Sequence, residues 1–300
     1  MTKKPPAIIF VPGIRPKPDA ELHAAQLRRC LSAGVVRAGG SPAAAEALAA
    51  AFRLVGWSRG FYGGHGDISV DVPGIERLLA GQDSVTADVR EARSFGRRIT
   101  AVLYALSDRF PVLSDIFGTR RMQTRVAEMH QYFSDDDGKA SVARLMVAEA
   151  LQLAWKNRQP VVLIGHSFGS VIAYDTLWEL CHLQSNPGKV DLFVTMGSPL
   201  TMNYIRQRLK GAQRSGAERY PTNIKRWINL AALGEVTALD RKLSRCFAEM
   251  IKLGLVPAIE DNLELINQFH GPDGLNVHKC YGYFASPMVG QLLLEWSESK

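Results

Sequence analysis

Short runs of apolar, largely β-branched residues alternate with longer segments of helical pattern along this 300-residue chain. This alternation is typical of a parallel β-sheet with helices on both faces. Most of the runs are continuously hydrophobic, as strands buried on both faces are; the second is the weakest, because Arg53 and Gly56 interrupt it. The expected strands are residues 7–11, 52–57, 160–165, 190–196 and 225–231. The expected helices are residues 20–36, 139–157, 168–183, 200–211, 240–253 and 285–297.

Composition restricts the class of protein but gives no activity. A chain that is 46% hydrophobic can bury a substantial core and is not disordered. No apolar run reaches the roughly 20 residues that cross a bilayer. The first apolar run, residues 7–11, stops at Pro12 and Gly13 and is too short for a signal peptide, so we expect a cytoplasmic protein. The four cysteines, Cys30, Cys181, Cys246 and Cys280, lie far apart and indicate neither a zinc site nor a disulfide framework.

The net charge of +7 raises the possibility of an anionic partner. The basic residues are dispersed, with pairs such as Arg97-Arg98 and Arg120-Arg121 as the densest clusters. No nucleic-acid-binding motif accompanies them. We therefore expect a solvated basic surface and no nucleic-acid partner.

The third expected strand runs directly into Gly165-His166-Ser167-Phe168-Gly169, and a helical pattern follows at once. This is a G-x-S-x-G sequence in a strand–turn–helix setting. So tight a turn strains the backbone of the serine and lifts its hydroxyl clear of the sheet, while glycines on either side avoid collisions with the neighbouring strand and helix. The helix N-terminus adds oriented N–H groups where an oxyanion would form. Ser167 is therefore a nucleophile candidate.

With this motif and four other blocks, the chain resembles the α/β-hydrolase superfamily, and in particular bacterial serine esterases and lipase-like members. The resemblance covers nearly the whole chain, and the blocks occur in the order that the fold requires. The blocks are residues 9–14 (Ile-Phe-Val-Pro-Gly-Ile), 165–175, 196–200 (Met-Gly-Ser-Pro-Leu), 226–230 (Arg-Trp-Ile-Asn-Leu) and 276–283 (Asn-Val-His-Lys-Cys-Tyr-Gly-Tyr). The resemblance implies one α/β-hydrolase domain over residues 1–300, a mostly parallel sheet flanked by helices.

About a hundred residues separate the second expected strand from the third, where a simple crossover needs only a few tens. This interval holds a glycine-rich turn at 60–66, a long helical pattern at 74–108 and an aromatic-containing segment at 110–117. Residues 60–140 are expected to form an insertion over one end of the sheet. It is either a larger helical layer or a cap that shapes a substrate pocket.

A serine nucleophile needs a histidine base, and the resemblance implies that the acid and then the histidine follow the serine. Beyond Ser167 stand His182, His270 and His278. His182 lies in the helix that leaves the serine, which carries it out of reach. His278 is preferred to His270 because it precedes the last helix within the block at 276–283.

The resemblance implies that the carboxylate follows either the strand after the nucleophile or the next strand. Gly197, Ser198 and Pro199 follow the fourth strand and exclude that location. Glu235 stands shortly after the fifth strand and is the favoured acid. Asp240 is the alternative, although it is expected to cap a helix.

An oxyanion hole requires two N–H donors. One is expected from Phe168, and the resemblance places the other at Ile14. Relatives usually carry His-Gly before that residue, whereas this chain has Pro12-Gly13. Proline removes a backbone N–H and stiffens the turn. The geometry of the oxyanion hole is therefore the point at which this chain departs from the pattern of the relatives.

The sequence therefore predicts a serine hydrolase that cleaves a carboxylic ester, thioester or lipid acyl ester through an acyl-enzyme on Ser167, with no cofactor and no metal. Three alternatives stay open: an acyltransferase with the same residues, a non-catalytic binding protein, and a phospholipase in peripheral contact with anionic membranes. For the phospholipase, the residues of interest are Arg97, Arg98, Arg120, Arg121 and Arg125. Asp175 is expected to be a buried hydrogen-bonding group, and His65 and Asp67 to be solvated.

Overall fold

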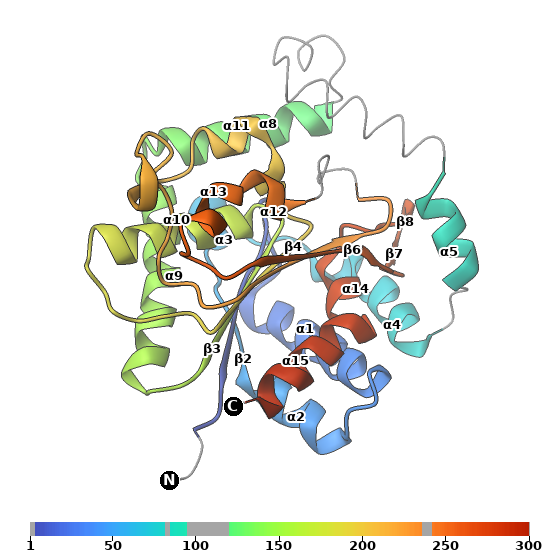
Figure 1. Ribbon diagram of the computed structural model, residues 1–300. Helices are drawn as coiled ribbons and strands as arrows, with labels where there is room; N and C mark the ends of the chain where they lie inside the picture. Colours follow the sequence, from blue (N-terminus) through green and yellow to red (C-terminus); the bar gives the residue numbers. More distant parts are fainter. Residues whose placement is uncertain (1–3, 82–84, 95–119, 236–241, 300) are drawn as a thin grey trace.

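The computed structural model describes residues 4–81, 85–94, 120–235 and 242–299 (Figure 1). A six-stranded sheet in the order β2-β1-β3-β4-β5-β6 forms its centre, and every neighbouring pair of strands is parallel. The strands are β1 (Ala7–Val11), β2 (Phe52–Leu54), β3 (Val161–His166), β4 (Leu192–Met196), β5 (Trp227–Ala232) and β6 (Ile259–Leu265). The predicted α/β class is confirmed.

Two strands differ from the prediction. β2 has three residues, because the chain leaves the sheet after Leu54 and enters α3 (Ser58–Tyr62). β6 was not predicted, since its sequence Ile-Glu-Asp-Asn-Leu-Glu-Leu lacks a continuous apolar run. It lies at the edge of the sheet with β5 as its one neighbour, and its charged side chains are exposed or half-buried. Edge strands tolerate charge that central strands do not.

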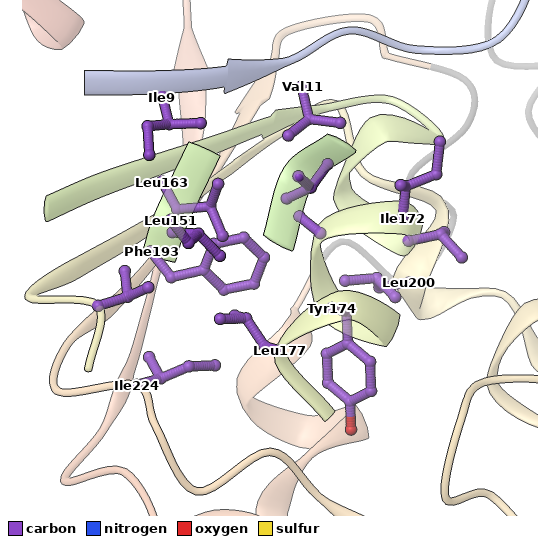
Figure 2. Close-up of a cluster of buried hydrophobic side chains, with 14 of the residues drawn as sticks. Ile9, Val11, Leu151, Leu163, Ile172, Tyr174, Leu177, Phe193, Leu200 and Ile224 are labelled. Atoms are coloured by element: carbon purple, nitrogen blue, oxygen red, sulfur yellow. The ribbon is translucent and has the colours of Figure 1, made fainter. Parts of the chain in front are cut away.

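Successive strand residues point to opposite faces of the sheet and build two apolar cores. Ile9, Val11 and Leu163 face one core, and Ile8 and Phe10 face the other. Figure 2 shows the first core, where Leu151, Ile172 and Leu177 from two helices meet the sheet. Around it pack α3, α8 (Arg120–Ser134), α9 (Lys139–Lys156), α10 (Gly169–His182), α11 (Asn203–Arg206), α12 (Leu243–Cys246) and α13 (Ala248–Lys252). Around the second pack α1 (Ala20–Arg37), α2 (Pro42–Ala51), α4 (Val72–Ala80), α5 (Val85–Ala92), α14 (Cys280–Phe284) and α15 (Pro287–Glu298).

The predicted helices at 20–36, 139–157, 168–183 and 285–297 are confirmed as α1, α9, α10 and α15. The other two are wrong as continuous helices. The segment 200–211 divides into the 3₁₀ turn η2 (Pro199–Thr201) and α11, with Met202 extended between them. The described part of 240–253 divides into α12 and α13 at Phe247. Further short elements are η1 (Ile68–Val70), η3 (Gly216–Arg219) and the hairpin β7 (His270–Gly271) with β8 (Gly274–Leu275).

The expected insertion contains α3, η1, α4, α5 and α8. A continuous helix over 74–108 is wrong in its described part, because α4 ends at Ala80 and the next residue, Gly81, has a left-handed φ of 64°. Residues 95–119, which include the aromatic-containing segment, lie outside the described residues. α8 and α11 lie side by side, with the Phe133 and Tyr204 rings 6.3 Å apart (Figure 1). None of the described helices is long and apolar enough to span a lipid bilayer.

Candidate active site

Ser167 lies between the carboxyl end of β3 and the start of α10. From β1 the chain passes to β2 on one side, whereas β3 lies on the other side of β1. The adjacent ends of β1 and β3 therefore form a topological switch point, which is where ligands bind in open α/β sheets. Ser167 therefore lies at the carboxyl ends of β1 and β3, the part of the sheet most suited to a binding site.

The turn at Ser167 is as tight as the motif predicts. Ser167 has a φ of 52°, a left-handed conformation that non-glycine residues seldom adopt. A Cβ on Gly165 would lie 2.5 Å from Ser170 Cα, and one on Gly169 would lie 2.1 Å from the Val11 carbonyl oxygen. Both positions thus exclude any side chain. The Ser170 hydroxyl adds a bond of 2.6 Å to the Ser167 carbonyl oxygen, which fixes the turn further.

A continuous chain of hydrogen bonds joins Ser167, His278 and Glu235. His278 Nε2 lies 2.9 Å from Ser167 Oγ, and His278 Nδ1 lies 2.8 Å from Glu235 Oε2. An ionised carboxylate only accepts hydrogen bonds, so the ring proton of a neutral His278 lies on Nδ1. The lone pair of Nε2 is then directed at the serine hydroxyl. This arrangement lets an imidazole remove a proton from the hydroxyl.

Glu235 is held by the end of β5. The residue is 3% exposed, and its backbone N–H donates to Ala232 O at 3.0 Å. The Tyr283 hydroxyl donates to Glu235 Oε2 at 3.3 Å and accepts from the Ala232 N–H at 3.0 Å. Tyr283 therefore ties the carboxylate to the strand, and α14 supplies a second support for it.

His278 lies in the loop between β8 and α14, and two side chains that sequence reasoning missed fix its backbone. Asn267 Nδ2 donates to the carbonyl oxygens of Val277 and Lys279, at 2.8 and 2.9 Å. His166 Nε2 lies 2.8 Å from the His278 carbonyl oxygen. Burial keeps the pKa of His166 well below its usual value, so the ring is neutral and donates from Nε2. The position of His166 within the serine motif was the only signal in the sequence.

The two expected oxyanion donors flank the serine. Phe168 is the residue after it, and the turn of Ile14 passes against it, since a Cβ on Gly13 would lie 2.8 Å from Ser167 Cβ. Within the described part of the chain, neither the Phe168 N–H nor the Ile14 N–H donates a hydrogen bond. Two such donors beside one serine are what a developing oxyanion requires.

The alternative base and acid lie elsewhere or are not described. His270 Nε2 lies 3.3 Å from Asp88 Oδ1 of α5 rather than near Ser167 Oγ. His182 Nε2 bonds to the Tyr220 carbonyl oxygen at 2.8 Å. Asp240 lies outside the described residues, so the preference for Glu235 over it rests on the contact that Glu235 makes.

Asp175, in the helix after the serine, is a buried hydrogen-bonding group as predicted. It is 1% exposed and accepts bonds from the Tyr132 hydroxyl at 2.9 Å and the Lys210 N–H at 2.8 Å. Burial raises its pKa to about 6. His65 and Asp67 are exposed, which agrees with the expectation that they are solvated.

The arginines singled out for a membrane contact are not described. Arg97 and Arg98 lie outside the described residues, and so do the side chains of Arg120, Arg121 and Arg125. The anionic-membrane alternative stays a prediction.

All four cysteines are free thiols. Across the described ranges, no group of three His, Cys, Asp or Glu side chains is arranged to hold a metal ion. No family model, curated protein or solved structure matches the chain.

Proposed function

We propose that the chain is a serine hydrolase of the α/β-hydrolase type, which cleaves a carboxylic ester, thioester or lipid acyl ester through an acyl-enzyme on Ser167. The observation that carries the proposal is the hydrogen-bonded chain from Ser167 Oγ through His278 to Glu235. A serine, a base and an orienting carboxylate in this relation are the requirements for nucleophilic catalysis by a hydroxyl group.

The sheet supports this reading independently. Nucleophile, acid and base follow one another in the chain as Ser167, Glu235 and His278, the order typical of α/β-hydrolases. Ser167 follows β3, Glu235 follows β5, and His278 lies beyond the edge strand β6. Parallel strands bring these carboxyl ends to one edge of the sheet.

In the first half of the reaction, His278 Nε2 takes the Ser167 proton while Oγ attacks the carbonyl carbon. The carbonyl oxygen becomes an oxyanion and accepts bonds from the N–H groups of Phe168 and Ile14. Collapse of this intermediate breaks the bond to the leaving group, which receives the proton from His278. Glu235 stabilises the imidazolium between these two steps.

In the second half, His278 takes a proton from water, and the resulting hydroxide attacks the acyl carbon. The Ser167–acyl bond breaks, Oγ regains a proton from His278, and a carboxylic acid leaves. An alcohol or amine in place of water would give acyl transfer, with the same residues in the same roles. The supply of acceptor, rather than the geometry, separates the two reactions.

The experiment is a series of p-nitrophenyl esters from acetate to dodecanoate, assayed with wild type, with Ser167→Ala and with the matched control Ser297→Ala in α15. We expect hydrolysis by wild type and by the control, and a loss of about 10⁵-fold or more in Ser167→Ala. Release of free acid alone identifies a hydrolase, and an ester or amide formed from an added acceptor identifies an acyltransferase. Equal rates in wild type and Ser167→Ala would contradict the proposal.

A further inference from the structure

The turn after β1 carries the expected donor Ile14 but has no regular secondary structure of its own. Arg15, immediately after the donor, has a φ of 82°, in the left-handed region that favours glycine. A turn of this kind needs external contacts to hold one geometry. The described contacts of residues 12–15 identify what holds it.

Three side chains bond to the backbone of the turn. Trp57 Nε1 donates to the Pro12 carbonyl oxygen at 2.9 Å. Lys17 Nζ donates to the Ile14 carbonyl oxygen at 2.8 Å, and the Arg15 N–H donates to the Tyr62 hydroxyl at 2.7 Å.

The Ile14 N–H belongs to the Gly13–Ile14 peptide group, and the three bonds are made to the peptide groups directly before and after it. The Pro12 carbonyl belongs to the peptide group before it, and the Ile14 carbonyl and Arg15 N–H both belong to the peptide group after it. The Gly13–Ile14 peptide between them is thus restrained from both sides, while its own N–H has no hydrogen-bond partner among the described residues. The Ile14 N–H is therefore held in one direction and remains available to donate a hydrogen bond.

The two aromatic members of this set support each other. Trp57 is 1% exposed and immediately precedes α3, and Tyr62 ends α3. The Trp57 and Tyr62 ring centroids lie 6.2 Å apart, and Phe61 lies between 5.0 and 5.5 Å from both. A rigid aromatic group therefore fixes the positions of the indole N–H and the phenol hydroxyl.

We infer that Trp57, Tyr62 and Lys17 are positioning residues that hold the Ile14 N–H in place for the developing oxyanion. The inference rests on the proposed function. It assigns a role to the start of the segment between β2 and β3, and it accounts for the geometry of the turn with proline at position 12. The three side chains act on the backbone of the turn and not on the reacting atoms.

The test compares an oxygen ester with its thionoester, in which sulfur replaces the carbonyl oxygen. Sulfur accepts hydrogen bonds weakly, so a well-placed donor favours the oxygen ester selectively. The variants are Tyr62→Phe, Trp57→Phe and Lys17→Met. Each has a control elsewhere in the chain. Trp155→Phe and Lys4→Met remove the same kind of bond, from a side-chain N–H to a backbone carbonyl oxygen, and Tyr220→Phe removes a phenol hydroxyl that donates to Glu249.

Loss of a whole oxyanion donor costs about 10²–10³ in kcat, and loosening one should cost about 10-fold. We expect that loss for the oxygen ester in each variant, with KM within about 2-fold of wild type and a much smaller loss for the thionoester. The ratio of the two rates therefore falls in the three variants and not in the controls. A merely structural role would lower both rates alike.

Tyr62 is half-buried and Tyr62→Phe removes one oxygen atom, so this variant carries the test if Trp57→Phe does not fold. Wild-type rate ratios in Tyr62→Phe and Lys17→Met would overturn the inference and leave the proposed function intact. Absence of any Ser167-dependent hydrolysis in wild type would overturn the proposed function, and the inference with it.

Discussion

Two histidines of the C-terminal region, His270 and His278, each meet a carboxylate from another part of the chain but differ in what they can do. In one pair, His278 Nδ1 lies 2.8 Å from Glu235 Oε2. In the other, His270 Nε2 lies 3.3 Å from Asp88 Oδ1. Both carboxylates are almost fully buried, so burial and the carboxylate contact do not distinguish the pairs.

The pairs differ at the second ring nitrogen. His278 Nε2 faces the Ser167 hydroxyl at 2.9 Å, whereas His270 Nδ1 lies 3.2 Å from the carbonyl oxygen of Gln268. A carbonyl oxygen has no proton to give, so these two contacts of His270 join α5 to β7 and offer no nucleophile. A histidine–carboxylate pair becomes a general base only where its free nitrogen faces a nucleophile.

The largest contrast is expected from replacing the two histidines. His278→Gln removes the proposed base and should lower kcat by about 10⁴–10⁶-fold. His270→Gln should leave kcat within about 2-fold of wild type, because its ring does not touch the reacting atoms. Steady-state ester hydrolysis measures both. A larger loss in His270→Gln than in His278→Gln would reverse the comparison.

The two carboxylates should differ almost as strongly. Glu235→Gln leaves no ionised acceptor to hold the proton on His278 Nδ1, and a change of this kind costs about 10⁴-fold in kcat. Asp88→Asn should lower the melting temperature by a few degrees, because it weakens the contact between α5 and His270, and kcat should stay close to wild type. A full rate in Glu235→Gln would refute the assignment of the acid and direct attention to Asp240.

A third contrast concerns two histidines that each meet a carbonyl oxygen. His166→Leu removes the bond to the His278 backbone and should lower kcat about 10-fold with little change in KM, because small displacements of a base are costly. His166→Gln keeps a donor near Nε2 and should restore most of the rate. His182→Leu removes the equivalent bond to Tyr220 and serves as the control. Equal kcat in His166→Leu and His182→Leu would contradict the claim that His166 positions His278.

The last contrast concerns stability rather than activity and is expected at Asp175, a buried carboxylate that bonds to Tyr132 and the Lys210 N–H. Its pKa is raised to about 6 in the folded chain, against about 3.9 in an unfolded one. The folded chain therefore binds more protons between these values, so this group's contribution to the free energy of unfolding is full below pH 4 and is lost as pH rises through 6. Asp175→Asn should remove that dependence with kcat within a few-fold of wild type. Identical pH dependence of urea unfolding in wild type and variant would contradict this.

Local sequence predicted the central parts of the fold and site because their determinants are local. The run from Val161 into the glycine-flanked Ser167 specifies a strand, a turn and a helix together. Glu235 and His278 could be selected from the order of elements together with the resemblance to α/β-hydrolases. The edge strand β6 was not predicted, because its charged residues interrupt any apolar run.

Other features depend on contacts between distant parts of the chain. The expected helix at 200–211 breaks in a segment where the Lys210 N–H bonds to the Asp175 carboxylate, 35 residues away in the sequence. The bonds of Asn267 to both neighbours of His278, and of Trp57 to Pro12, likewise exist only in the folded chain. No pattern of residue types within a short window identifies such partners.

The central claim is that Ser167 is a nucleophile activated by His278. It is tested most directly by incubating wild type, Ser167→Ala and His278→Gln with a fluorophosphonate probe and locating the adduct by peptide mass spectrometry. We expect one adduct per wild-type chain, on the peptide that contains Ser167, none in Ser167→Ala, and much slower labelling of His278→Gln. An unlabelled wild-type chain, or an adduct on another residue, would contradict the claim.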